Sequence, residues 1–387
     1  MARRTYRAGQ VFDGRTMHRD AAVLVENGRS RGVVAAKAIP SGYEPVETGA
    51  WCLAPGFVDL QVNGGGGVQF GQEISVEAIE TICAAHALFG TTSVMVTLIT
   101  DTPENTARAL DCAVAAQAAR TPGFLGIHFE GPHLSLAKKG AHHPGLIRPM
   151  SDADLAFLVD ARRRLDHLMV TLAPESVTEA QVRKLAEAGV PVSLGHTACD
   201  SETADRYAAA GARLATHLFN AMSQLDHRRP GLAAAILLNE GLTTGLIADG
   251  IHVHPDMIRL AAKAMGATRR MFLVTDAMAP IGTDMADFTL NGRKIFRRNG
   301  TLKLADGTLA GADIDMVASI KWLHRVAGFP IEEALAMATS IPASALGVSE
   351  GRGTLDDGAV ADIVAISEDF EAHILSHASS GAAVSSA

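Results

Sequence analysis

The sequence predicts an α/β protein: a (β/α)8 TIM barrel with a small β-sandwich domain formed from both chain termini. From Leu53 to about Leu346, short apolar runs alternate eight times with longer amphipathic stretches, as expected of parallel strands joined by crossover helices. The two ends carry only short extended stretches without a helical period. We therefore assign residues 53–346 to the barrel, and residues 1–52 together with 347–387 to the discontinuous small domain.

The eight expected barrel strands are the short apolar runs. They lie at residues 56–62, 92–99, 124–129, 168–172, 191–194, 214–217, 244–248 and 271–275. An amphipathic stretch follows each run. Residues 74–89 place apolar side chains at helical spacing, and residues 177–188 predict a second helix, which Ser176 and Glu179 would begin with a capping box.

The flanking segments predict strands. Residues 22–25, 32–35 and 361–366 are short apolar runs at the two ends of the chain. Residues 288–304 contain two Asn-Gly pairs, which favour tight hairpin turns, so we expect a β-hairpin inserted after the eighth barrel strand. The small and polar residues from about 376 to 387 are typical of a disordered tail.

Composition and charge exclude several classes of protein. Apolar residues make up 48% of the 387 residues, which excludes a disordered chain. A formal net charge of -8 argues against a nucleic-acid partner, because such binding needs basic surfaces. We expect no membrane segment and no secretory signal, and the four cysteines show no paired spacing. These features indicate a cytoplasmic protein with reduced thiols.

Polar side chains follow four of the expected strands. They are Glu130, His196, His217 and Asp276. The carboxyl ends of barrel strands build the active site in this fold. One carboxylate and two imidazoles suit Zn²⁺, Fe²⁺ or Mn²⁺ and leave a coordination position open for water. Asp276 could accept a proton from that water, although each residue alone could equally be a structural capping or ion-pairing group.

Several segments closely resemble one enzyme family. They are residues 55–64, 128–132, 138–142, 194–197, 216–222, 248–252 and 274–277. They resemble the N-acetylglucosamine-6-phosphate deacetylases of the amidohydrolase superfamily, in order, from about Val11 to Ile366. The resemblance implies hydrolysis of N-acetylglucosamine 6-phosphate to glucosamine 6-phosphate and acetate, in amino-sugar catabolism or cell-wall recycling.

The resemblance also implies roles for individual residues. Glu130, His196 and His217 would bind one divalent metal ion, with Zn²⁺ expected first and Fe²⁺ or Mn²⁺ as alternatives. Asp276 would be the general base that later protonates the leaving amine. His142 would hydrogen-bond the acetyl carbonyl and help to stabilise the oxyanion.

The expected substrate contacts come from further matching positions. These positions are Ala141, Asn220, Ala221, Arg228, Asp249, His252, Leu309, Ala310 and Gly311. Arg228 and His252, with backbone groups of Asn220 and Ala221, would bind the phosphate, for which a planar guanidinium is well suited. Because some phosphate contacts in the family come from a neighbouring subunit, the resemblance implies a homodimer.

One departure concerns the number of metal ions. Many barrel amidohydrolases carry a His-x-His pair at the end of the first strand, where this sequence has Gln61 and Asn63. Amides are poor ligands for these ions, so we predict a site for a single metal.

Three other functions remain open at this point. N-acetylgalactosamine 6-phosphate differs from the gluco substrate only in the orientation of one hydroxyl group, and the metal motifs cannot separate the two. A non-catalytic sugar-phosphate binding protein could share the fold, and a different amidohydrolase could cut a cyclic amide or deaminate a base.

Overall fold

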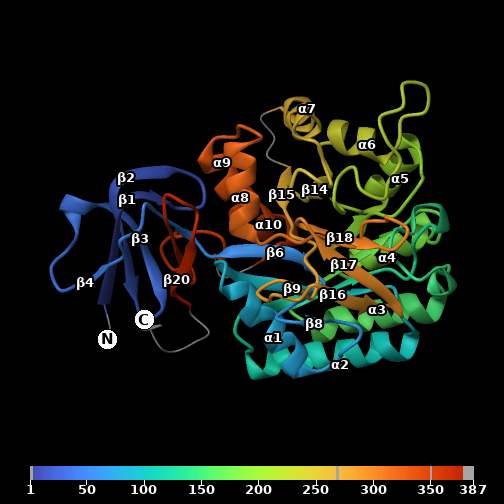
Figure 1. The fold of residues 1–387 in the computed structure, drawn as a ribbon, viewed down its shortest axis with the longest axis horizontal. Coiled ribbons are helices and arrows are strands. Elements are labelled where there is room, and N and C mark those ends of the chain that lie inside the picture. Colours follow the sequence, from blue (N-terminus) through green and yellow to red (C-terminus); the bar gives the residue numbers. More distant parts are fainter. Residues whose placement is uncertain (1–2, 267–269, 349–350, 378–387) are drawn as a thin grey trace.

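The computed structural model describes residues 3–266, 270–348 and 351–377, and its largest part is a barrel of eight parallel strands (Figure 1). The strands, in spatial order, are β6 (Phe57–Val62), β9 (Thr91–Ile99), β10 (Phe124–Glu130), β11 (Leu168–Leu172), β12 (Val192–Leu194), β13 (Leu214–Ala215), β14 (Thr243–Leu246) and β15 (Met271–Leu273). A parallel bridge between Val62 and Ala277 closes the ring, and the Asp276 amide donates to the Gln61 carbonyl at 2.9 Å. The predicted barrel is confirmed, and each predicted run overlaps one strand.

Helices surround the barrel. They are α1 (Val76–Ala87), α2 (Pro103–Ala119), α3 (Asp152–Arg164), α4 (Glu179–Glu187), α5 (Ser201–Ala210), α6 (Leu232–Leu238), α7 (Pro255–Met265), α8 (Met316–Arg325), α9 (Ile331–Ala338) and α10 (Ser340–Leu346). Short 3-10 turns lie at Ala36–Ala38, Leu136–Lys138 and Pro144–Leu146. In the part of the chain that the structure describes, no helix has the length and apolar character needed to cross a membrane.

The capping box predicted for α4 was placed on the wrong residues. Thr178 is the N-cap: its hydroxyl accepts the amide of Gln181, and the Gln181 side chain accepts the amide of Thr178. The Ser176 hydroxyl instead donates to the carbonyl of Leu134 at 2.7 Å. A Thr-x-x-Gln sequence and a Ser-x-x-Glu sequence can both cap the free backbone amides at the start of a helix. The motif alone therefore did not decide whether Ser176 or Thr178 is the N-cap.

The barrel interior changes from apolar to polar toward the carboxyl ends of the strands. Its apolar layers include Val58, Leu60, Met95, Met169, Leu214, Ile247, Phe272 and Val274, all buried. Because strand side chains alternate between faces, the next inward positions along these strands carry polar groups. The lower barrel is therefore a packed apolar core, and the polar end lies where the fold places active sites.

Both ends of the chain contribute to one seven-stranded sheet beside the barrel, where β20 lies near the N-terminal strands (Figure 1). Its strands are β1 (Arg3–Phe12), β2 (Met17–Glu26), β3 (Arg29–Ala35), β4 (Glu44–Glu47), β5 (Cys52–Pro55), β19 (Ile363–Ile366) and β20 (Ala372–Ser376). The edge strand β3 also contacts the segment that precedes β19, because Arg29 and Val360 form an antiparallel bridge and the Ser30 amide donates to the carbonyl of Ala359 at 2.8 Å. The sheet encloses its own apolar core around Val11, Val23 and Ile363.

This sheet bears on the predicted domain limits. β5 pairs with β1 and β19, so the N-terminal part of the sheet extends slightly past residue 52. Ser376 ends β20, whereas residues 378–387 of the predicted tail lie outside the described residues.

The insert after β15 contains three strands, one more than a hairpin. They are β16 (Asp287–Leu290), β17 (Arg293–Arg298) and β18 (Thr301–Leu304), all antiparallel. Both predicted turns form, and Asn291 and Asn299 have φ of 50° and 51°, each followed by a glycine with positive φ, as type I′ turns require. A second small ribbon, β7 (Gly64–Gly65) with β8 (Val68–Gln69), follows β6.

Candidate active site

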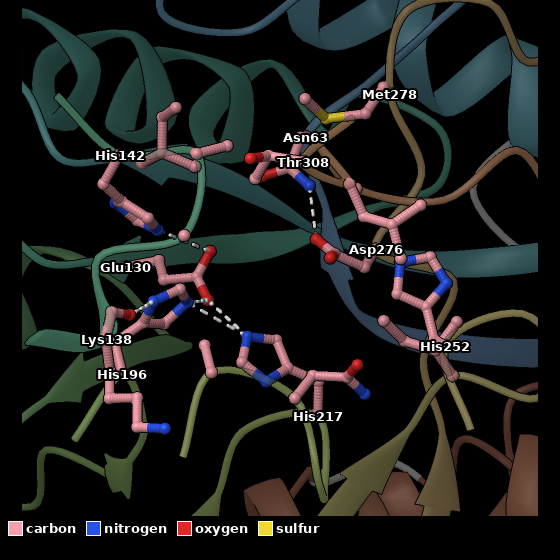
Figure 2. A pocket seen from close by; sticks show the side chains of 18 of the residues that line it. Asn63, Glu130, Lys138, His142, His196, His217, His252, Asp276, Met278 and Thr308 are labelled. Atoms are coloured by element: carbon pink, nitrogen blue, oxygen red, sulfur yellow. Dashed lines mark hydrogen bonds and ion pairs between the residues drawn. The ribbon is translucent and has the colours of Figure 1, made fainter. Parts of the chain in front are cut away.

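A cavity of about 520 Å³ opens at the carboxyl ends of the barrel strands (Figure 2). Glu130, His196, His217 and Asp276, the four strand-end residues predicted from the sequence, all line it. Side chains separated by as many as 146 positions in the sequence thus meet in one place, because neighbouring parallel strands end at the same edge of the barrel.

Three of these side chains converge on one point. The Nε2 atoms of His196 and His217 each lie 3.3 Å from Oε1 of Glu130, and the two Nε2 atoms are 3.1 Å apart. Ligands bound at about 2.0–2.1 Å at the corners of a tetrahedron stand about 3.3–3.4 Å from one another. The three atoms therefore have the spacing of three corners around one metal ion.

The hydrogen bonds and pKa shifts of these three side chains are also those expected of a cation site. The Nδ1 atom of His196 contacts the Lys138 carbonyl at 2.8 Å. It must donate there, which leaves the Nε2 lone pair for a metal. Burial opposes the charge of Glu130, yet the two imidazoles hold the pKa of its carboxyl well below the ordinary value. The pKa of His217 is raised, because the contact with Glu130 outweighs burial.

His142 is the fourth imidazole group to consider. Ligand atoms of Glu130, His142 and His196 lie within 4.8 Å of one another, so this alternative trio could also hold an ion. Nδ1 of His142, however, lies 2.8 Å from the hydroxyl of Thr100 and 3.3 Å from its backbone amide. The hydroxyl can donate or accept, but the amide can only donate to Nδ1, and burial lowers the pKa of this imidazole to about 3. A neutral ring that accepts at Nδ1 carries its proton on Nε2. We therefore favour His217 as the third ligand and His142 as an N–H donor facing Glu130 and the cavity.

Asp276 faces the same space from the other side, and two amides hold it. Asn63 donates to its Oδ1 atom at 2.6 Å and Gln61 at 3.3 Å, and Gln61 also donates to Glu130 at 3.0 Å. Burial, followed by the nearby charge of Glu130, raises the pKa of Asp276 to about 6. A carboxyl with this pKa is suited to exchange a proton near neutral pH.

The backbone is strained where these side chains leave the strands. His196, His217 and Asp276 have φ of 48°, 33° and 50°, values uncommon for residues other than glycine. The chain turns sharply there, which explains why β13 and β15 end before the predicted limits. Such strain is found where function requires a side chain to be aimed.

The predicted substrate residues divide into two groups. Ala141, Asn220, Ala221, His252, Leu309 and Gly311 line the cavity. Asp249 lies behind His252, whose Nδ1 atom it contacts at 2.5 Å, and Ala310 is buried beside the lining. Arg228 is exposed and does not line the cavity. Its amide donates to Asp226 at 2.8 Å, so it stands outside the site of its own chain.

Some residues around the cavity were not predicted. Leu290 and Thr308, from the insert and the loop after it, line the cavity, as do Met278 and Lys138. Arg293 reaches from β17 to the carbonyl of Ala141, which ties the insert to the loop that carries His142. The Asn-Gly turns predict the insert, but no local signal shows which barrel loop it covers.

Comparisons with known proteins agree with this geometry. The model of the amidohydrolase family matches residues 52–382. A curated N-acetylgalactosamine-6-phosphate deacetylase of Shewanella sp. (strain ANA-3) is 39% identical over 317 residues, which cover 82% of this chain and 79% of that protein. A Haemophilus influenzae N-acetylglucosamine-6-phosphate deacetylase is 32% identical over 355 residues, covering 91% and 92%.

A solved structure has the same fold over almost the whole length. The crystal structure of N-acetylglucosamine-6-phosphate deacetylase from Pasteurella multocida superposes with a TM-score of 0.91 at 33% identity, covering 97% of each chain. The superposition therefore includes the barrel, the terminal sheet and the insert.

Proposed function

The chain belongs to the amidohydrolase family and, within it, to the N-acetylglucosamine-6-phosphate deacetylases, and on this premise we propose that it hydrolyses N-acetylglucosamine 6-phosphate to glucosamine 6-phosphate and acetate. The observation that carries the proposal is the cavity in which a three-ligand metal geometry, an N–H donor and a buried carboxylate face one another. Amino-sugar catabolism or cell-wall recycling would use this reaction.

One divalent ion would be held by Glu130, His196 and His217. Zn²⁺ is the first expectation, with Fe²⁺ and Mn²⁺ as alternatives, since all three accept nitrogen and oxygen ligands. When bound, the ion would supply Lewis-acid polarisation of the acetyl carbonyl and acidification of a water molecule. Gln61 and Asn63 support a single ion, because a neutral amide oxygen binds these ions more weakly than an imidazole would, and their amide nitrogens donate to Glu130 and Asp276.

The protein's own groups account for the proton transfers. Asp276 would take the proton of the attacking water and deliver it to the amine nitrogen as the C–N bond breaks, which releases the free amine and acetic acid, which then loses its proton to solvent to give acetate. The Nε2–H of His142 would donate to the oxyanion that develops on the acetyl oxygen. Asn63 holds Oδ1 of Asp276 in place, which leaves Oδ2 for this exchange.

The phosphate would bind to His252 and to the backbone at Asn220 and Ala221. Nδ1 of His252 lies 2.5 Å from Oδ2 of Asp249, and this contact holds the imidazole in place at the cavity wall. Because Arg228 stands outside its own cavity, we propose that it serves the site of a partner subunit in a homodimer.

The four cysteines are free thiols, which supports a cytoplasmic location.

N-acetylgalactosamine 6-phosphate is the second candidate substrate, favoured by the 39% identity to a deacetylase named for that sugar. The experiment is acetate release by the purified protein from both 6-phosphates and from unphosphorylated N-acetylglucosamine. Higher kcat/KM on the gluco 6-phosphate supports the proposal, and higher kcat/KM on the galacto epimer supports the second candidate. Binding of either sugar phosphate without acetate release would indicate a non-catalytic binding protein.

A further inference from the structure

Five buried polar side chains form a layer directly beneath the proposed metal ligands, and we propose that this layer positions the ligands. The residues, called the polar layer here, are Thr97, His128, Thr171, Ser193 and Thr216. Each is at most 4% exposed. None of them lines the cavity, so they act through the ligands and touch no substrate.

The polar layer is continuous. Thr97 Oγ1 lies 3.2 Å from Nδ1 of His128, and Nε2 of His128 lies 2.7 Å from Oγ1 of Thr171. Thr171 Oγ1 is 2.7 Å from Thr216 Oγ1, which is 2.6 Å from Ser193 Oγ. The chain of contacts crosses β9, β10, β11 and β12 and reaches the residue that follows β13.

These contacts occur next to the proposed ligands. His128 precedes Glu130 by two residues on β10, Thr216 directly precedes His217, and Ser193 is three residues before His196. Thr171 is the register partner of Glu130. The polar layer therefore links the three strands that lead to the proposed ligands, one to three residues before each ligand.

Gly195 makes the central contact possible. Thr171 lies on β11 and Thr216 directly follows β13, so the two residues flank β12, and their hydroxyl groups meet beside Gly195. A Cβ atom at this glycine would lie 2.8 Å from Thr171 Cγ2 and 2.9 Å from Thr216 Cβ. Both distances are too short, so the contact requires glycine at this position.

The hydrogen-bond directions follow from counting donors. If Ser193 donates to Thr216, Thr216 to Thr171 and Thr171 to Nε2 of His128, the Nδ1–H of His128 donates to Thr97. The Thr97 hydroxyl then donates to the carbonyl of Met95 at 3.4 Å, and every hydroxyl in the layer has an acceptor. In the reverse direction the Ser193 hydroxyl has no acceptor among the described residues, and a buried unpaired donor is unfavourable. The polar layer therefore assigns His128 the Nδ1–H tautomer.

This inference rests on the proposed metal-dependent function, and two measurements test it. The first is the ¹⁵N spectrum of histidine-labelled protein, with the His128 signals assigned from their loss in His128→Gln. We expect protonated Nδ1 and unprotonated Nε2. Protonation at Nε2 would overturn the hydrogen-bond direction and the argument built on it.

The second measurement is the dissociation constant for Zn²⁺, by competition with a chelator, in wild type, T171V, T171S and T91V. Thr91 is the matched control: it is buried on β9 and its hydroxyl has no partner among the described residues. Removal of a group that orients ligands weakens metal binding by about 10- to 100-fold, so we expect this loss in T171V, with T171S and T91V close to wild type.

Two outcomes would contradict the positioning role. T171V and T91V with equal affinity for Zn²⁺ would show that the hydroxyl network is not needed, provided that the wild type binds the ion. T171S as weak as T171V would show that the lost methyl packing matters instead. No binding of Zn²⁺, Fe²⁺ or Mn²⁺ by the wild type would refute the proposed function itself, and the positioning role with it.

Discussion

Replacing Asp276 with asparagine should nearly abolish turnover while making the metal-free protein more stable. The side-chain oxygen of the introduced asparagine can still accept from Asn63 and Gln61, which now donate to Oδ1 at 2.6 and 3.3 Å. The change therefore removes the proton acceptor and keeps the geometry. Loss of a general base costs about 10²- to 10⁴-fold in kcat, which corresponds to about 3–5 kcal/mol of transition-state stabilisation.

The stability gain follows from the pKa of Asp276. Burial raises it from 3.8 to about 6. An acid whose folded-state pKa is raised destabilises the folded protein above that pKa, and this cost disappears as the pH falls toward the unfolded value. About two pKa units correspond to about 3 kcal/mol at pH 8. For a chain of this length that is about 4 °C in Tm.

The assay is acetate release together with thermal unfolding of the chelated proteins at pH 8 and pH 5. We expect D276N to show unchanged affinity for the phosphosugar, a loss of kcat of at least about 100-fold, and a gain in Tm that is larger at pH 8 than at pH 5. A loss of kcat of only a few-fold would refute the assignment of Asp276 as the base. A lower Tm at pH 8 would refute the argument from its burial.

Three further predictions concern the metal and its surroundings. H217A should lose bound metal by elemental analysis, whereas H142A should keep it and lose about 10²- to 10³-fold in kcat; the opposite result would make His142 the ligand. Gly195→Ala should destabilise the fold by about 1–3 kcal/mol through overpacking against Thr171 and Thr216, and an unchanged denaturation midpoint would contradict this. Removal of metal from a sample at 100 times the dissociation constant should lower stability by about 2.7 kcal/mol, reversibly on its return, and an unchanged Tm would argue against a bound ion.

The barrel was predictable because its signal is periodic and repeated. Eight apolar runs separated by amphipathic stretches admit few other arrangements, and the parallel topology then brings Glu130 and His196 to the same edge. Three predicted runs were two residues too long, those ending at His217, Ala248 and Thr275. In two of them the chain leaves the strand through a residue with positive φ, His217 or Asp276. Local hydrophobicity contains no information about that turn.

The rest depends on contacts between distant segments. Gln61 and Asn63 were predicted only as poor metal ligands, yet their amides hold Asp276, more than 210 positions away in the chain. The exposed position of Arg228 and the contact of the insert with the carbonyl of Ala141 also depend on contacts between distant segments. Side-chain hydrogen bonds of this kind follow from the folded geometry, and neither composition nor spacing predicts them.

The most direct test of the account is acetate release from N-acetylglucosamine 6-phosphate before chelation, after chelation, and after return of Zn²⁺, Fe²⁺ or Mn²⁺, with the metal content of each sample measured. We predict that turnover disappears with the metal and returns with one equivalent of one of these ions per chain. Full turnover in the chelated, metal-free protein would contradict the account, and a requirement for two equivalents would contradict the single-metal site.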